Sequence, residues 1–141
     1  MSRGRRELEV AYLCTEYRVL LEGGPLSFFA DIFDSAAQAR LVGECGLQRE
    51  WAILTPCNPQ SERLSGEQNG MRLAALETEL GRRRVSRFRA LNHDPAGQWP
   101  DEPGFLLVDA DFGWLLELGR RYRQNALLAA AINEAPRLVW L

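Results

Sequence analysis

The stretch "ILTPCNPQSERLSGEQNGMR", residues 53–72, joins a predicted buried strand to the longest predicted helix, and the rest of the fold can be worked out from this junction. The apolar run that ends at Thr55 is rich in strand-forming residues and stops before a proline, which is typical of a buried strand. Ser65 and Gln68 stand three residues apart and match a capping box. We therefore predict a helix that begins at Ser65 and runs to about Arg83.

The apolar stripe of this predicted helix has an amide at its front end. Leu73, Leu76 and Leu80 recur at helical spacing, and Asn69 lies four residues before the first of them. A buried amide without a hydrogen-bond partner costs about 1–3 kcal/mol, so we expect Asn69 to be paired with the strand end or the turn before the helix. The expected partners are Thr55, Asn58 and Ser61.

Arg72 lies on the flank of the same helix face, three residues after Asn69. Free N–H groups at a helix start, together with a nearby arginine, favour an anion. The sequence therefore predicts a polar strand-to-helix junction that binds a small anionic ligand or a segment of a partner protein. A purely structural role is the alternative, with Asn58 in an Asx turn and Asn69 as its internal brace.

The segments on both sides of the junction predict an α+β fold. We expect a single domain over residues 1–141, in which one mixed or mostly antiparallel sheet packs against three to four helices. The closing strand should pair with an apolar, central strand that precedes it. The other predicted helices cover residues 6–17, 36–45 and 112–123, and the other predicted strands cover residues 17–21, 26–32, 50–55, 85–91, 105–110, 126–132 and 137–141.

The composition is that of an ordinary globular protein, with 46% hydrophobic and 26% charged residues. No apolar stretch approaches the roughly 18 residues of a membrane span, and no apolar signal-peptide core follows the N-terminus. We therefore expect a cytoplasmic protein without membrane contact. The three cysteines and the one histidine lack the spacing of a zinc site or a disulfide framework, so we expect no metal and no cofactor.

All 17 basic residues are arginine, which excludes a Schiff-base lysine, a P-loop lysine and a Ser-Lys dyad within this chain. The net charge of −2 offers no overall attraction to nucleic acid. The arginine-rich run over residues 82–89 could contact phosphates, but no aromatic platform accompanies it. A solvated helix end beside a sheet edge is the better interpretation, and nucleic acid is not an expected partner.

The predicted loop "NHDPAGQWPDEPG", residues 92–104, contains the candidate acid–base group. Glu102 lies between two proline-containing pairs, and burial there would raise the pKa of its carboxyl group toward the range that general acid–base catalysis needs. A salt bridge from Glu102 to Arg72 is the structural alternative. Trp99 could stack on a ligand or cover the core. A Cys57–His93 nucleophile pair is also conceivable, although a buried thiol is the simpler interpretation.

Three segments, "TPCNPQSERLSGEQN", "WPDEPGFLLV" and "RRYRQNALL", together resemble an uncharacterised bacterial family, domain of unknown function 3293. Tyr12, Thr15 and Tyr17 resemble the tyrosine–threonine–tyrosine helix with which the family opens. The chain departs from the family pattern at Pro56-Cys57 and at Gln68. The site residues that the resemblance implies are Thr55, Asn58, Pro59, Ser61, Asn69, Arg72, Trp99, Glu102, Gln124 and Asn125.

Gln124 and Asn125 follow a predicted arginine-rich helix end, where an asparagine could form a left-handed C-cap. Their amides could instead face the Asn58–Asn69 cluster.

The resemblance brings no known activity, so three functions stay open. The leading prediction is a protein that binds a small anionic ligand or a partner segment without chemistry of its own. The first alternative is a hydrolase or transferase in which Glu102 is the acid or base, while Asn58, Asn69 and Arg72 stabilise developing charge. The second alternative is a protein–protein or nucleic-acid interaction module. Whether the chain is an enzyme is left open by the sequence.

Overall fold

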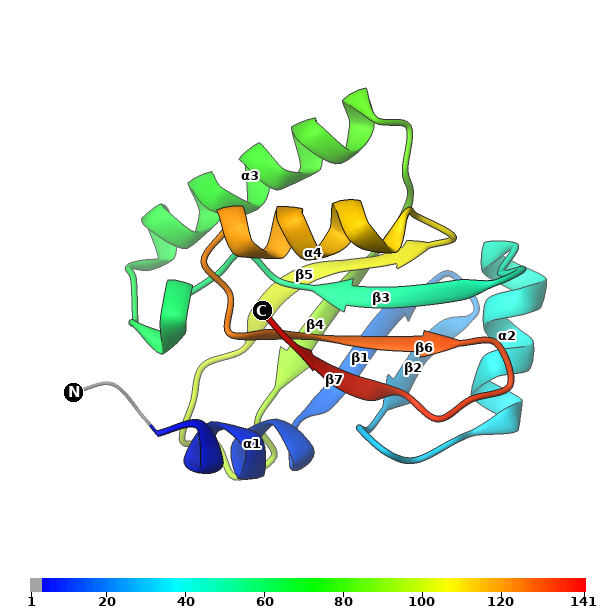
Figure 1. The fold of residues 1–141 in the computed structure, drawn as a ribbon, viewed down its shortest axis with the longest axis horizontal. Helices are drawn as coiled ribbons and strands as arrows, with labels where there is room; N and C mark the ends of the chain where they lie inside the picture. The colour runs from blue at the N-terminus through cyan, green and yellow to red at the C-terminus, as the bar shows by residue number, and fades with distance from the viewer. Residues whose placement is uncertain (1–3) are drawn as a thin grey trace.

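The computed structural model of the chain describes residues 4–141 and has an α+β fold (Figure 1). Within those residues, seven strands form one antiparallel sheet in the order β2-β1-β4-β5-β3-β6-β7, accompanied by four α-helices. This confirms the predicted fold class. The elements are α1 (Arg5–Leu13), β1 (Glu16–Leu21), β2 (Gly24–Phe28), α2 (Ser35–Cys45), β3 (Glu50–Leu54), the 3₁₀ turn η1 (Pro59–Ser61), α3 (Gly66–Arg82), β4 (Ser86–His93), β5 (Glu102–Val108), α4 (Phe112–Arg121), β6 (Ala126–Ala131) and β7 (Arg137–Trp140).

The sheet is curled into a half-barrel, and its two faces bury separate apolar clusters. The outer face packs against α3 and α4 through residues such as Leu76 and Leu118, while the inner face encloses Trp51 and Leu41. The curl brings the segment after β2 near the segment before β7, where the Asp31 N–H donates to the Pro136 carbonyl at 2.6 Å. In Figure 1, α2 lies at one end of the curl and α1 at the other.

The helix that follows the opening stretch forms as predicted. The Ser65 side chain accepts from the Gln68 N–H, and the Gln68 side chain accepts from the Ser65 N–H, which completes the capping box. Leu76 and Leu80 are fully buried against the sheet. At the start of α4, Asp111 is the N-cap, because its carboxylate accepts from the Trp114 N–H.

Three local predictions were wrong. The first helix ends at Leu13, because Tyr17 and Val19 alternate with exposed residues and pair with β2 and β4 as part of β1. The second helix begins at Ser35, one residue before its predicted start, and Asp34 is its N-cap. The segment before residue 105 is strand and not loop, because Glu102 pairs with Asn92 in the β4–β5 ladder.

The apolar strand β6 also differs from its predicted central place. It pairs with β7, as predicted, but it is the second strand from the edge of the sheet. Its apolar character is explained by the two buried clusters, since Leu127 packs on the outer face and Leu128 on the inner one.

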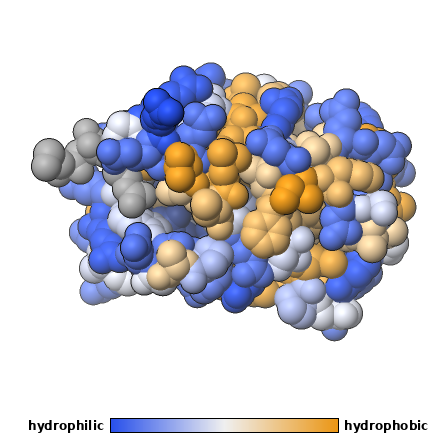
Figure 2. All heavy atoms as spheres, turned by 90° about the horizontal axis from the view of Figure 1, so that it is seen from below, coloured by the Kyte–Doolittle hydropathy of each residue, from blue (hydrophilic) through white to orange (hydrophobic). Residues whose placement is uncertain are grey.

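Apolar side chains also reach the molecular surface. Figure 2 shows several of them among polar side chains on the face seen from below. Within residues 4–141, no helix combines the length and the apolar character that a membrane span requires. The large apolar residues that are exposed are Val10, Leu13, Leu20, Phe29, Ile32, Phe33, Val42 and Met71.

Asp109 ties the end of β5 to the segment that leads into β3. Its carboxylate accepts hydrogen bonds from the N–H groups of Gln48, Arg49 and Glu50 at 2.7–3.0 Å. Partial burial acts to raise the pKa of Asp109, but these three bonds outweigh it and hold the pKa below its usual value. Ionised Asp109 therefore stabilises the fold.

Replacement of Asp109 by asparagine should lower the free energy of unfolding by about 1 kcal/mol at neutral pH, because the charge and one acceptor are lost. The folded-state pKa of Asp109 is depressed, so its stabilisation is present above the unfolded pKa of about 3.9 and is lost as the pH falls through the folded value. Urea unfolding of both proteins should show this difference shrinking below about pH 4. A difference that is constant from neutral to strongly acidic pH would contradict this account.

Candidate functional site

The Asn58–Asn69 pair holds the strand end, the turn and the helix start together. The Asn58 N–H donates to Asn69 Oδ1 at 2.9 Å, and Asn69 Nδ2 donates to Asn58 Oδ1 at 2.8 Å. The same Asn58 oxygen accepts from the Leu64 N–H at 2.9 Å. This confirms the predicted pairing of Asn69 with the Asn-Pro bend. Asn58 is buried and has a left-handed backbone with φ of 48°, a conformation that asparagine adopts more readily than most residues.

The second predicted group, Glu102, lies against the same turn. Asn58 Nδ2 donates to Glu102 Oε2 at 2.7 Å, and the Trp99 indole N–H donates to the same oxygen at 3.1 Å. Burial raises the pKa of the Glu102 carboxyl, while these two hydrogen bonds act in the opposite direction. No arginine or histidine within residues 4–141 forms an ion pair with this carboxylate.

Arg72 does not form the salt bridge with Glu102 that was the structural alternative for this carboxylate. Its Nε donates to the Pro56 carbonyl at 2.6 Å, and its Nη2 donates to the Tyr122 carbonyl. The guanidinium carbon also lies 5.6 Å from the centre of the Tyr122 ring. Arg72 therefore braces α3 against two loops.

Thr55 also serves the local framework. Its hydroxyl donates to the Pro103 carbonyl at 2.8 Å and accepts from the Cys57 N–H at 3.1 Å. These bonds hold the end of β3 against the start of β5, and so bring Asn58 next to Glu102.

Gln124 and Asn125 face the loop that contains Asn58 and η1. Gln124 Nε2 donates to the Cys57 carbonyl at 3.0 Å. Asn125 Nδ2 donates to Ser61 Oγ at 2.9 Å and to the Tyr12 hydroxyl at 3.3 Å. The left-handed residue after α4 is Arg123, with φ of 57°, so the alternative prediction of Asn125 as a left-handed C-cap was wrong.

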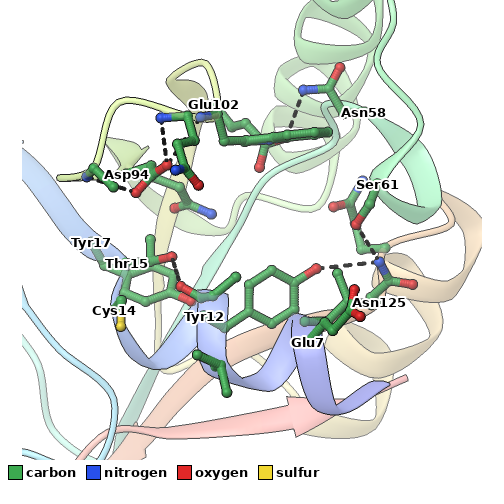
Figure 3. Close-up of a pocket in the computed structure, with 18 residues that line it drawn as sticks. Glu7, Tyr12, Cys14, Thr15, Tyr17, Asn58, Ser61, Asp94, Glu102 and Asn125 are labelled. Carbon is green, nitrogen blue, oxygen red and sulfur yellow. Dashed lines mark hydrogen bonds between the residues drawn. The ribbon is translucent and has the colours of Figure 1, made fainter. Parts of the chain in front are cut away.

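These groups border a cavity of about 320 Å³ between α1 and the open end of the curled sheet. Figure 3 shows Glu102 and Asn58 on one side of it and α1, with Tyr12 and Glu7, on the other. The residues that line it are Glu7, Leu8, Val10, Ala11, Tyr12, Cys14, Thr15, Tyr17, Asn58, Ser61, Asn92, Asp94, Ala96, Gln98, Trp99, Glu102, Gln124 and Asn125.

The cavity gathers six of the ten predicted site residues. They are Asn58, Ser61, Trp99, Glu102, Gln124 and Asn125, whereas Pro59, Asn69 and Arg72 lie outside the lining. Thr55 borders a smaller inner recess of about 20 Å³, which Glu102 and Tyr17 share with the main cavity. Such a recess has room for a single water molecule.

Sequence reasoning missed the wall that α1 and β4 contribute. Tyr12 and Asn92 were not predicted as site residues, although Tyr12 and Tyr17 resemble the family's opening pattern, which was the one available signal. Burial raises the pKa of Tyr17, so its hydroxyl stays protonated beside Glu102.

The charged groups of the cavity lining all carry negative charge. Glu7, Asp94 and Glu102 are present, and no arginine or histidine is among the described residues that line it. The Asp94 carboxylate accepts from the N–H groups of Ala96, Gln98 and Trp99, and these bonds lower its pKa. Asp94 is therefore ionised at neutral pH at the rim of the cavity.

Within residues 4–141, no basic side chain is hydrogen-bonded to the Cys57 thiol near the site. Burial raises the pKa of Cys57, and its Sγ lies 3.5 Å from the Pro103 carbonyl oxygen. His93 is bonded through Nδ1 to Asp101 at 2.7 Å instead. Within residues 4–141, no three His, Cys, Asp or Glu side chains are grouped so that they could hold a metal ion.

The fold and the site define a class of α+β protein in which a curled antiparallel sheet opens into an acidic, aromatic-lined cavity beneath an N-terminal helix. The chain belongs to the family described as protein of unknown function (DUF3293), whose profile matches residues 54–127, just over half of its length. Neither a curated protein nor a solved structure shows significant similarity to the chain.

Proposed function

We propose that this protein binds a small organic ligand in the α1 cavity, with Glu102 as the anchoring group. The cavity's volume of about 320 Å³ falls in the range of small-molecule sites. Its lining combines the aromatic rings of Tyr12, Tyr17 and Trp99 with a few converging polar groups, which is the usual composition of a ligand pocket.

The hydrogen bonding of Glu102 is the observation that carries this proposal. Both protein donors, from Asn58 and Trp99, bind Oε2. Within residues 4–141, no protein group donates a hydrogen bond to the other carboxylate oxygen, Oε1. A carboxylate that is held in place through one oxygen is a preorganised acceptor for a ligand at the other.

Catalysis is the second candidate function, because one specific observation favours it. Burial raises the pKa of Glu102, and a carboxyl group with a raised pKa at a cavity is a recurrent general acid or base. In this alternative Asn58 would hold Glu102 in position, and the hydroxyl of Tyr17 would be a further proton donor. Conversion of a bound compound, followed by mass spectrometry, would distinguish an enzyme from a binding protein.

A partner segment is a weaker proposal for this site, because α1 covers one side of the cavity. The exposed side chains of Ile32 and Phe33 would favour an interaction module at another surface.

The ligand-binding proposal predicts that Glu102→Gln reduces ligand binding without loss of the fold. A thermal-shift screen of metabolites against the wild-type protein should yield compounds that raise its melting temperature, and the same compounds should raise that of Glu102→Gln much less. The matched control is Glu134→Gln, an exposed site in the β6–β7 turn away from the cavity lining. Compounds that stabilise all three proteins equally would place binding outside this cavity and contradict the proposal.

A further inference from the structure

Among the described residues that line the cavity, none places a positive charge opposite Glu102. Glu102 has two hydrogen bonds but no cationic partner within residues 4–141, and the other charged groups of the lining are Glu7 and Asp94. A carboxylate removed from water is costly unless it is paired with a cation and hydrogen-bonded. Within residues 4–141, Glu102 has the hydrogen bonds but is paired with no cation.

The polar atoms that Gln124 and Asn125 leave available to the cavity are acceptors. The side-chain nitrogen of Gln124 donates to the carbonyls of Cys57 and Tyr122, and that of Asn125 donates to Ser61 and Tyr12. Since these amide nitrogens are engaged by the protein, the polar atoms left to the two side chains are their carbonyl oxygens. Ammonium and guanidinium groups are donors only, so they complement such a set of acceptors.

The aromatic residues of the lining fit the same chemistry. Tyr12, Tyr17 and Trp99 line the same cavity as the carboxylates, and aromatic faces attract cations. The protein already uses this attraction next to the cavity, where the guanidinium carbon of Arg63 lies 4.9 Å from the centre of the Trp99 ring. Aromatic rings beside carboxylates are a favourable environment for an organic cation.

We infer that the ligand of the α1 cavity is an organic cation, an amine or a guanidine with a compact apolar body, whose charged group pairs with Glu102. This inference rests on the proposed small-ligand function and specifies the ligand's chemical class. It differs from the sequence-based expectation of an anionic ligand, which depended on Arg72. That side chain is bonded to the Pro56 and Tyr122 carbonyls and does not line the cavity.

A series of compounds with one body and different charges tests the inference. Benzylamine, benzamidine, benzyl alcohol and benzoate share an aromatic ring, and their affinities can be compared by isothermal titration calorimetry. The two cations should bind wild-type protein roughly tenfold to a hundredfold more tightly than the alcohol, which is the range expected for a charge-assisted hydrogen bond, and benzoate should bind most weakly.

Two variants assign the effect to particular carboxylates. Glu102→Gln should reduce the affinity for benzylamine at least roughly tenfold and leave that for benzyl alcohol nearly unchanged. Glu7→Gln, on the exposed side of α1, should reduce the affinity for benzylamine only about twofold to threefold, because solvent screens the charge of Glu7. Glu134→Gln is again the control, and circular dichroism of each variant verifies its fold.

The outcomes separate the ligand class from the ligand-binding proposal itself. Benzyl alcohol or benzoate could bind as tightly as the amines, with an affinity that Tyr12→Ala weakens. The cavity would then be a ligand site, but the cationic class would be overturned. If no cation in the series binds, the cationic class is also overturned, whereas the metabolite screen still tests ligand binding. If the amines bind Glu102→Gln as tightly as wild type, Glu102 is not the charge that recognises them, and the inference fails.

Discussion

Replacement of Gly104 by alanine is expected to lower the free energy of unfolding by about 3 kcal/mol, a large effect for the addition of one methyl group. A Cβ at this position would lie 2.2 Å from the Leu54 carbonyl oxygen and 2.9 Å from the Thr55 Cα. Both atoms belong to the backbone at the end of β3, which is hydrogen-bonded to β5 and cannot move without breaking that pairing. Urea unfolding followed by circular dichroism measures the loss.

The same substitution at Gly43 is the matched control. Gly43 is exposed in α2, and a Cβ there would meet no atom within 4 Å. Alanine at that helical position should stabilise the protein by roughly 0.5–1 kcal/mol, because glycine costs more conformational entropy in a helix. Equal stability of the two variants would show that the end of β3 can move away from β5 at little cost, which would contradict the close packing at Gly104.

Gly104 also affects the site, because the close approach that it permits places Asn58 beside Glu102. The hydroxyl of Thr55 bonds the Pro103 carbonyl, and three residues later Asn58 donates to Glu102. If the Gly104→Ala variant folds, the displaced loop should weaken that hydrogen bond, and ligand binding should fall together with stability.

The parts of the fold and site that could be predicted from sequence depend on contacts that are local along the chain. The capping box of Ser65 and Gln68 spans three residues, and the burial of Leu76 and Leu80 follows from helical periodicity. Asn69 interrupts that apolar stripe, which was enough to predict its bond to the preceding turn.

The parts that could not be predicted depend on which strands become neighbours. Glu102 belongs to β5 because it pairs with Asn92 of β4, and no pattern within residues 92–104 encodes that pairing. Arg72 is long enough to reach several acceptors, and only the position of the loop after α4 decides that it bonds Tyr122 and not Glu102. Likewise, α1 borders the site because the sheet curls, which is a property of the whole molecule.

Asn58→Asp is expected to make the stability of the protein depend strongly on pH. The new carboxylate keeps the oxygen that accepts from Leu64 and Asn69, but its second oxygen replaces the nitrogen that lies 2.7 Å from Glu102 Oε2. Two carboxylate oxygens this close must share a proton, so one of the two pKa values rises well above the unfolded value of about 4. Burial already acts in the same direction on Glu102.

The direction in which the variant's stability changes with pH follows from that raised pKa. A group whose folded pKa exceeds its unfolded pKa contributes stability below the unfolded value and loses it as the pH rises through the folded value. The variant should therefore be close to wild type near about pH 4 and about 3 kcal/mol less stable near about pH 8, a difference that corresponds to a pKa rise of about two units. Urea unfolding of both proteins across this pH range measures the difference.

The double variant Asn58→Asp with Glu102→Gln is the decisive control, because it exchanges donor and acceptor across the same contact. The glutamine amide can donate to the new carboxylate, so the pH dependence of the single variant should largely disappear. Only part of the lost stability should return, because the Trp99 indole N–H then faces the glutamine nitrogen in place of an oxygen. If the double variant retains the pH dependence, the new carboxylate is titrating against some other group. A single variant that is equally destabilised at all pH values would mean that position 58 matters only for the shape of the turn.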